Sequence, residues 1–503
     1  MEEVINKNEK GGHNSMIQIN YDTNKDFDAL ALPPSMHEII FVKGTPHEMG
    51  FQYGQKAKDM IVRNFFVILA QALQHYTREQ LEQRIADLVA EMESKTPEIK
   101  EWWEGIADGS GLTYGEVALL NLQLWFVNPG FQDTALCSCV AATKSATKDG
   151  KTIAGVNADV TFNMCGYSII VFAFPDDGYP FVTIPSLAGQ MGGNFVMNSE
   201  GLVICFDGGG VTDKNQWKIG YADFISAMVY TITHEKTAES ARDRFESLGA
   251  GGGWIFLFAD CEKNILIDEH TGYKNYTRYP GEHGEKDYIH AANHFISDKM
   301  KDHCSPEGWE DSRYRYDAEE ELLQQHFGNL DLQKMMGILG CKKIFANGQW
   351  SEEQIWDPKA SFYTPEMGAP DFRTGTRAFG LTEEGVCYIM HGTAYTVNSY
   401  MPGSTGKFAK IPVGKGRVLD VVNAMEQDAV MEVWGLSEKM YGVGDIPEPT
   451  MKLIDKAKSH LWIGKNYLAK AIVAMGGDEI KANDNFGLAA SQFAKAFITA
   501  QLV

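Results

Sequence analysis

The chain has 503 residues, of which 44% are hydrophobic, and its formal net charge is −22. This composition describes a folded globular protein, long enough for roughly two to four domains. The negative charge opposes binding to nucleic acids and to anionic membranes. No apolar run approaches the roughly 18 residues of a membrane span. The polar N-terminus lacks the apolar core of a signal peptide, so we expect a cytoplasmic protein.

Eight cysteines are scattered along the chain, and several lie within apolar segments. This is typical of reduced thiols in the core of a cytosolic protein. No Cys-x-x-Cys or histidine spacing indicates a zinc site. The glycine triplets at 208–210 and 251–253 lack the Lys-Ser/Thr of a nucleotide loop. We therefore expect neither a metal nor a cofactor.

The N-terminal part is predicted to be helical after one strand at 39–42. The glycines within 44–54 predict a close-packed helix start. Thr77 and Thr113 each precede a Gln or Glu by three residues, which is the capping-box pattern of a helix N-terminus. The block from 37 to 136 is thus a helical segment that delivers the chain to Cys137.

At Cys137 the pattern changes from helices to strands. Residues 137–142 are small and apolar, as in a buried strand. Asp149-Gly150 is a strong hairpin signal, and 152–156 reads as the returning strand. Asp159 follows that strand, so one hairpin brings a thiol and a carboxylate together.

The rest of the chain alternates between strand-rich and helix-rich blocks. Apolar runs bounded by turn residues predict strands at 167–174, 181–184, 195–197, 202–206, 254–259, 264–268, 288–294 and 385–390. Helical patterns predict helices at about 219–248 and 314–339, and again from about 412 onwards, including 461–475 and 488–498. This order suits two antiparallel sheets between helical layers.

The motif around Cys137 resembles a known family. Its order is Cys137, a small-residue run, Asp149-Gly150 and then Gly155-x-Asn157-x-Asp159. This resembles the acyl-CoA:6-aminopenicillanic-acid acyltransferase-like family of cysteine N-terminal-nucleophile (Ntn) hydrolases. The resemblance extends more weakly from about Gly44 to Gly392. It implies an α+β fold, the Ntn-hydrolase αββα sandwich, and autocatalytic cleavage between Leu136 and Cys137.

The resemblance also implies a division of the chain. Residues 1–136 would be a mostly helical segment, released as a small chain by self-cleavage. Residues 137–411 would form the catalytic sandwich. Residues 412–503 lie beyond the resemblance and are predicted to be a helical extension packed on the core. A subunit interface or a lid over the pocket are the alternatives for this extension.

Cys137 is the predicted nucleophile. A thiol attacks acyl groups as the thiolate, so it needs a base. In an Ntn hydrolase that base is the α-amine of the nucleophile itself, whose ordinary pKa is about 7.7–8. Cys139 is the competing nucleophile, although the family spacing to the Asp-Gly turn favours Cys137. The plain alternative is that Cys137 is an ordinary buried cysteine.

The resemblance assigns roles to three further residues. Asp159 would hold the new α-ammonium or orient the thiol, whereas Asn157 is interpreted as a structural amide. Asn293 could bind the tetrahedral oxyanion through its side-chain amide. The equal alternative is an asparagine that ends a strand and turns the chain. Arg313, in a Ser-Arg pair, would support the polar network, with Arg315 as a close rival.

Other positions leave the substrate open. Asn194 and Asp207 lie where strand ends could approach the site, and the oxyanion role there stays unassigned. Val156 stands where some relatives that bind carboxylate-bearing substrates have Arg, which argues against a bile-salt-like anionic site.

We therefore expect an enzyme that hydrolyses or transfers the acyl group of a small amide through a Cys137 acyl-enzyme. A phospholipase B-like lipid hydrolase and a non-catalytic binding protein on the same scaffold are the alternatives. We expect the partner to be a small-molecule substrate, and we expect neither nucleic-acid binding nor a membrane span. A homo-oligomer is left open.

Overall fold

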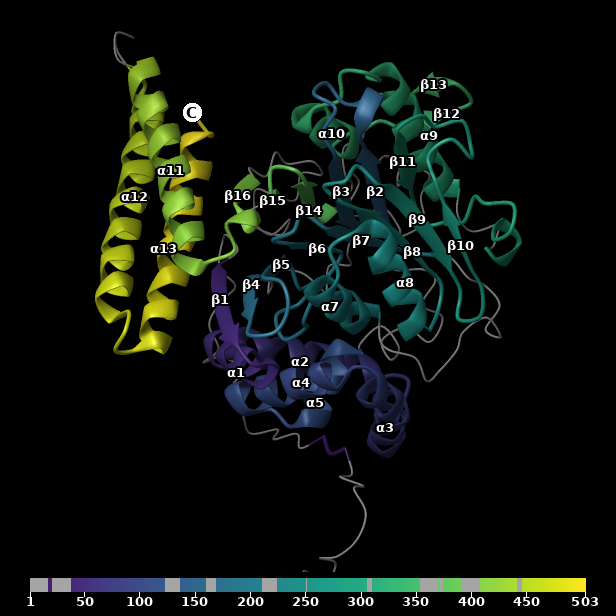
Figure 1. Cartoon of the computed structure of the whole chain (residues 1–503), viewed down its shortest axis with the longest axis horizontal. Helices are drawn as coiled ribbons and strands as arrows, with labels where there is room; N and C mark the ends of the chain where they lie inside the picture. Colours follow the sequence, from purple (N-terminus) through teal and green to yellow (C-terminus); the bar gives the residue numbers. More distant parts are fainter. Residues whose placement is uncertain are drawn as a thin grey trace, which may run out of the picture.

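Two β-sheets packed face to face form the centre of the protein (Figure 1). The computed structural model describes residues 17–19, 38–122, 136–159, 169–209, 224–249, 251–304, 310–352, 370, 374–390, 408–440 and 446–503. Cys139, Val156, Cys205 and Leu257 belong to the same buried apolar cluster, so the two sheets share one core. The part of the chain described here contains no helix long and apolar enough to cross a bilayer.

The larger sheet has eight strands within the described residues, in the order β1-β4-β5-β6-β7-β8-β9-β10. All neighbouring strands are antiparallel except β1 and β4, which are parallel. The strands are β1 (Ile39–Gly44), β4 (Ile170–Pro175), β5 (Phe181–Thr183), β6 (Phe195–Asn198), β7 (Val203–Gly208), β8 (Trp254–Ala259), β9 (Ile265–His270) and β10 (Asn275–Arg278).

The second sheet has six antiparallel strands among the described residues, in the order β11-β2-β3-β14-β15-β16. They are β2 (Leu136–Ala142), β3 (Ile153–Asp159), β11 (Tyr288–Ala291), β14 (Thr374–Leu381), β15 (Val386–Met390) and β16 (Phe408–Ile411). A separate short hairpin joins β12 (Phe345–Ala346) and β13 (Gln349–Trp350).

Helices cover the outer faces of both sheets. One apolar cluster joins the outer face of the larger sheet to α1 (Pro46–Lys56), α2 (Lys58–Ala72), α3 (Arg78–Lys95), α4 (Pro97–Ser110), α5 (Tyr114–Asn121), α7 (Phe224–His234) and α8 (Ala238–Leu248). A second cluster joins the outer face of the smaller sheet to α9 (Glu310–Gln325) and α10 (Leu332–Leu339). These layers confirm the predicted α+β fold with an αββα sandwich.

The C-terminal part forms three further helices beside the sheets, α11 (Val418–Met440), α12 (Glu448–Ala474) and α13 (Glu479–Ala500) (Figure 1). The helix α13 packs on the edge strand β1, where the amide N–H of Ile39 donates to Ser491 Oγ at 2.9 Å. Asn483 Nδ2 donates to the carbonyl of Phe41 at 2.7 Å. The edge strand contributed by the N-terminal segment is therefore covered, which protects its unpaired backbone groups.

Local sequence signals account for much of this structure. Thr77 and Thr113 cap α3 and α5 with complete capping boxes, as predicted. Thr45 caps α1 in the same way, which the sequence analysis did not anticipate. The pattern expected as one helix over 219–248 is two helices within the described residues, because the chain breaks between α7 and α8. The helices expected over about 314–339 are α9 and α10.

The predicted hairpin between β2 and β3 is confirmed, but its connection is longer than a tight turn. Cys137 pairs with Ala158, and Ala142 pairs with Ile153. Residues 143–152 join the strands and include a short 3₁₀ helix at Lys144–Ala146. Gly150 has a φ of 74°, which explains glycine in the Asp-Gly turn.

Close packing of α1 on α4 yields a stability prediction. A Cβ added at Gly50 would lie 2.1 Å from the carbonyl oxygen of Trp102, so Gly50→Ala must push the two helices apart. We expect a loss of about 1–3 kcal/mol in the free energy of unfolding. Gly337→Ala in α10 is the matched control, because its Cβ would meet open space. It should stabilise the protein by about 0.5–1 kcal/mol. Denaturant unfolding followed by tryptophan fluorescence measures both, and equal stabilities would contradict the packing argument.

Candidate active site

Cys137 lies at the beginning of β2, on the face that points into the shared core between the sheets. Directly paired residues of an antiparallel ladder share a face, so Cys137 lies on the same side as Ala158, and Cys139 on the same side as Val156. Cys137 is buried, with 2% of its surface exposed. Ser138 points the other way, toward α9.

Three side chains from distant parts of the chain bind three different atoms of Cys137. Its amide N–H donates to Asn293 Oδ1 at 2.9 Å. Its carbonyl oxygen accepts a hydrogen bond from Arg315 Nη1. Asn194 Nδ2 donates to its sulfur, Sγ, at 3.2 Å. The nitrogen, carbonyl and thiol of one residue are thus each fixed by a buried polar group.

Asn293 follows β11 and is brought to Cys137, as the sequence analysis expected, but in a different orientation. Its oxygen Oδ1 accepts from Cys137 and also from Arg315 Nη2 at 2.6 Å. Its nitrogen Nδ2 donates to the carbonyl of Gly208 at 2.8 Å. The donor that was expected to face an oxyanion is therefore directed at β7, a strand of the facing sheet.

The arginine of this network is Arg315 and not Arg313. Both lie on α9, but residues two positions apart on a helix point in nearly opposite directions. Arg315 is fully buried, and its Nη1 also donates to Ser138 Oγ at 3.1 Å. Arg313 is exposed. The sequence analysis proposed Arg313 for this network, with Arg315 as the rival. Arg315 is the one that reaches Cys137.

Residues of β3 occupy the neighbouring strand. The backbone of Asp159 pairs with Leu136, directly beside Cys137, but the Asp159 side chain lies outside what the structure describes. Asn157 serves as a structural amide: its Nδ2 donates to the carbonyl of Leu339 at 2.7 Å, and its Oδ1 accepts from Arg377. Val156 is buried in the core between the sheets.

Cys139 lies deeper in the core than Cys137. It is fully buried, and burial, together with Asp207 and Cys205, raises the pKa of its thiol well above the ordinary value. A thiol with a raised pKa has little thiolate and is a poor nucleophile. Asp207 belongs to β7 of the facing sheet and lies near β2, the strand that carries Cys137 and Cys139.

Asn194 was expected near the site from its place at a strand end, but its contact with the thiol was not predicted. Asn194 precedes β6, and its Nδ2 also donates to the carbonyl of Phe206 at 3.0 Å. No local motif marks this residue, because the contact depends on how the two sheets face each other. The only available signal was its place at a strand end.

His294 lies beside this network and contacts Ser312. Its Nδ1 is 2.7 Å from Ser312 Oγ. Burial, with the nearby charges of Arg315 and Arg313, lowers the pKa of His294 to about 3. Its imidazole is therefore neutral at ordinary pH. Within the described residues, no group of three His, Cys, Asp or Glu side chains is arranged to hold a metal ion.

The low pKa of His294 predicts that the folded protein loses stability at acidic pH. In the unfolded chain His294 titrates near pH 6.5, so between that pH and about 3 the unfolded state binds one proton more than the folded state. We expect stability to fall by up to about 1.4 kcal/mol per pH unit as the pH drops through this window. His290 has a raised pKa, so its contribution is present below pH 6.5 and is lost at higher pH, outside this window.

Urea unfolding at pH 7 and at pH 4.5 measures this effect. His294→Gln should lose less stability on acidification than the original protein does. The exposed His75→Gln is the control and should behave like the original protein. If both variants have the same acid dependence, His294 does not carry it.

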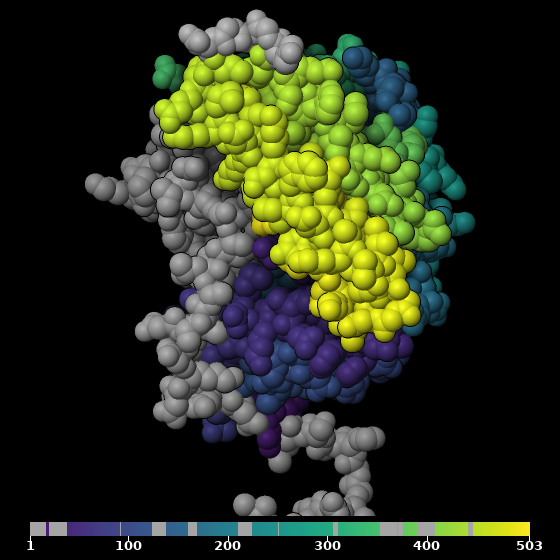
Figure 2. Space-filling view, turned by 90° about the vertical axis from the view of Figure 1, so that its left-hand side faces the viewer, coloured from purple at the N-terminus to yellow at the C-terminus, as the bar shows by residue number. Residues whose placement is uncertain are grey.

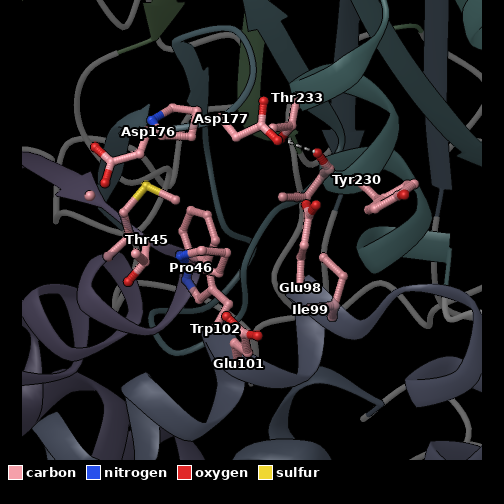
Figure 3. Close-up of a pocket in the computed structure, with 14 residues that line it drawn as sticks. Thr45, Pro46, Glu98, Ile99, Glu101, Trp102, Asp176, Asp177, Tyr230 and Thr233 are labelled. Carbon is pink, nitrogen blue, oxygen red and sulfur yellow. Dashed lines mark hydrogen bonds between the residues drawn. The ribbon is translucent and has the colours of Figure 1, made fainter.

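A pocket lies between α1, α4 and α7 (Figure 3). It has a volume of about 160 Å³. Trp102 and Tyr230 line it with the carboxylates of Glu98 and Asp177, and Glu98 Oε2 also binds His234 Nε2 at 2.8 Å. Asn194, Asn293 and Arg315, which bind Cys137, are not among the residues that line this pocket.

Comparisons with known proteins give distant similarities. No family model matches the chain. A curated relative from Archaeoglobus fulgidus, described as an uncharacterized protein, is 25% identical over 343 residues, which is 59% of this chain and 56% of that protein. The chain thus matches about half the length of that relative.

Two solved structures illustrate the structural similarities. A mutant conjugated bile acid hydrolase from Clostridium perfringens has a TM-score of 0.36 and 11% identity, covering 56% of this chain and 93% of its own. Penicillin V acylase from Agrobacterium tumefaciens has a TM-score of 0.34 and 9% identity, covering 55% of this chain and 91% of its own.

Proposed function

We propose that this chain is a self-processing cysteine Ntn hydrolase that cleaves or transfers the acyl group of a small amide through a Cys137 acyl-enzyme. The observation that carries the proposal is the set of bonds on Cys137: Asn293 on its nitrogen, Arg315 on its carbonyl and Asn194 on its sulfur. A merely structural buried cysteine needs no polar partner on its sulfur.

The first proposed step is cleavage of the Leu136–Cys137 bond. Cys137 Sγ attacks the carbonyl carbon of Leu136, the C–N bond breaks, and the Cys137 nitrogen takes up the thiol proton. Water then hydrolyses the resulting thioester, which leaves a Leu136 carboxylate and a free Cys137 thiol. The products are a new C-terminus and an α-amine on the nucleophile itself.

That amine is the proposed base of the second reaction. Its nitrogen is the atom that now donates to Asn293, so Asn293 is in place to orient it. An α-amine has an ordinary pKa close to working pH and can accept the thiol proton as Sγ attacks a substrate carbonyl. It returns this proton to the leaving amine, and water or another amine then resolves the acyl-enzyme.

Asn194 supports the thiol side of this chemistry. Its Nδ2 lies 3.2 Å from Sγ, where an N–H donor favours the thiolate over the thiol. The same donor would lie beside an oxyanion formed by attack of that sulfur. Asn194 is therefore our candidate oxyanion donor, and Asn293 and Arg315 are positioning residues. Asp159, for which the described atoms place only the backbone, keeps its proposed role of holding the α-ammonium.

The test is a substrate screen with trapping of the intermediate. N-acyl amino acids, penicillins, acyl-CoA thioesters and lysophospholipids are offered to the purified protein, and released amine or acid is measured. Rapid acid quench and mass spectrometry should find an acyl group on the peptide that begins at Cys137. Activity on lysophospholipids alone would favour the phospholipase-like alternative. No turnover and no adduct, with Cys137 replaceable, would favour a binding protein.

A further inference from the structure

The outer face of the C-terminal helices carries exposed apolar residues. The helix α13 is largely buried against α12, α11 and β1, whereas α11 and α12 form the surface on the side shown in Figure 2. Trp434 on α11 is 65% exposed, and Trp462 and Val473 on α12 are 67% and 86% exposed. Tryptophan side chains this exposed are typical of interaction sites.

Exposed residues recur along both helices at a repeating spacing, and the apolar ones among them are Met431, Trp434, Trp462, Ala469 and Val473. On α11 the exposed stripe has spacings of four, three and four residues and consists of Gln427, Met431, Trp434 and Glu438. On α12 the spacing alternates between four and three, through Asp455, Ser459, Trp462, Asn466, Ala469 and Val473. This is the heptad spacing with which one helix packs along another. Both helices thus present an unused seam to solvent.

The two helices carry opposite charges. Helix α11 has five acidic residues and one lysine, which gives a net charge of −4. Helix α12 has five lysines and two acidic residues, which gives +3 in a chain whose net charge is −22. One ion pair within the chain already joins them, between Lys465 Nζ and Glu426 Oε1 at 3.2 Å. Glu432 and Glu438 on α11, and Lys456 and Lys470 on α12, are outside that pair.

We propose that the α11–α12 face is the interface of a homodimer. A two-fold axis parallel to the helices would set α11 of each copy against α12 of the other. Such an interface is self-complementary, because one rotation pairs both acidic helices with both basic helices and covers both seams. A second copy of this chain therefore fits the face better than an anionic membrane, which α11 would repel. This inference is independent of the proposed reaction.

Native mass spectrometry and light scattering at micromolar concentration test the dimer. We expect the intact protein to have twice the mass of a 55.9 kDa chain. Trp462→Asp should weaken the dimer by at least about 10-fold, because buried tryptophans dominate interfaces. Tyr273→Asp is the control: Tyr273 is 60% exposed but lies between β9 and β10, so the dimer should persist.

Charge-reversal variants distinguish a lost dimer interface from a protein that no longer folds. Lys456→Glu with Lys470→Glu changes the net charge of α12 from +3 to −1, so that both helices are acidic. Glu432→Lys with Glu438→Lys changes the net charge of α11 from −4 to 0, which removes its attraction for the basic α12. Each double variant should be folded by circular dichroism but have the mass of one copy. Mixing the two variants should restore a dimer of one copy of each. A single-copy mass for the original protein, vesicle binding through this face, or a mixture that stays monomeric would overturn the proposal.

Discussion

Replacing Cys137 with alanine is expected to abolish both cleavage of the Leu136–Cys137 bond and acyl transfer. The substitution removes the sulfur on which both proposed steps depend while it keeps the backbone contacts to Asn293 and Arg315. Turnover should fall by about 10⁴-fold or more, as for other nucleophile deletions. Denaturing mass spectrometry should find one chain of 55.9 kDa in the variant. The original protein should give fragments of about 15 and about 41 kDa, because cleavage separates 136 residues from 367.

Cys139→Ala is the matched control for this result. Cys139 lies on the same strand and the same face, but its thiol has a raised pKa and is fully buried. The variant should keep both processing and turnover, apart from a modest cost for the lost packing volume. A fragment beginning at Cys139, or processing that survives Cys137→Ala, would move the nucleophile and contradict the proposal.

The sequence could predict the features that depend on neighbouring residues. The capping boxes at Thr77 and Thr113 each span only four consecutive residues, and both helices begin there. The hairpin from Cys137 to Asp159 is likewise local, since its register depends on alternation along two adjacent strands. The C-terminal helices were also expected, although α12 begins at Glu448, well before the predicted 461.

The polar contacts of the candidate site depend instead on tertiary structure. Asn194 reaches the thiol across 57 residues of sequence, and Arg315 reaches the Cys137 carbonyl across 178. Arg313 and Arg315 have the same chemistry, so only the rotation of α9 against β2 decides which of them is buried. The orientation of Asn293 was equally hidden, because its partner Gly208 lies on the facing sheet. The sequence shows which residues have side chains suited to the site, but it does not show which way those side chains point.

Replacing Arg315 with methionine is the second large effect that we expect. Arg315 is fully buried, and its guanidinium binds the Cys137 carbonyl, Ser138 Oγ and Asn293 Oδ1 at once. Methionine retains much of the volume but leaves these buried acceptors without their donor, which costs about 1–3 kcal/mol for each acceptor that stays unsatisfied. We therefore expect a protein that unfolds at much lower denaturant concentration and processes the Leu136–Cys137 bond slowly or not at all.

Two further variants make this result specific to the guanidinium. Arg313→Met changes the same residue type on the same helix at an exposed position, and it should leave stability within about 0.5 kcal/mol and processing unchanged. Arg315→Lys keeps the charge but lacks the planar fork that reaches several acceptors, so it should fold better than the methionine variant and still process poorly. If Arg313→Met impairs processing while Arg315→Met does not, the assignment of the buried arginine must be reversed. If Arg315→Lys processes normally, the charge alone is sufficient, and the fork that joins Cys137, Ser138 and Asn293 is not what positions the nucleophile.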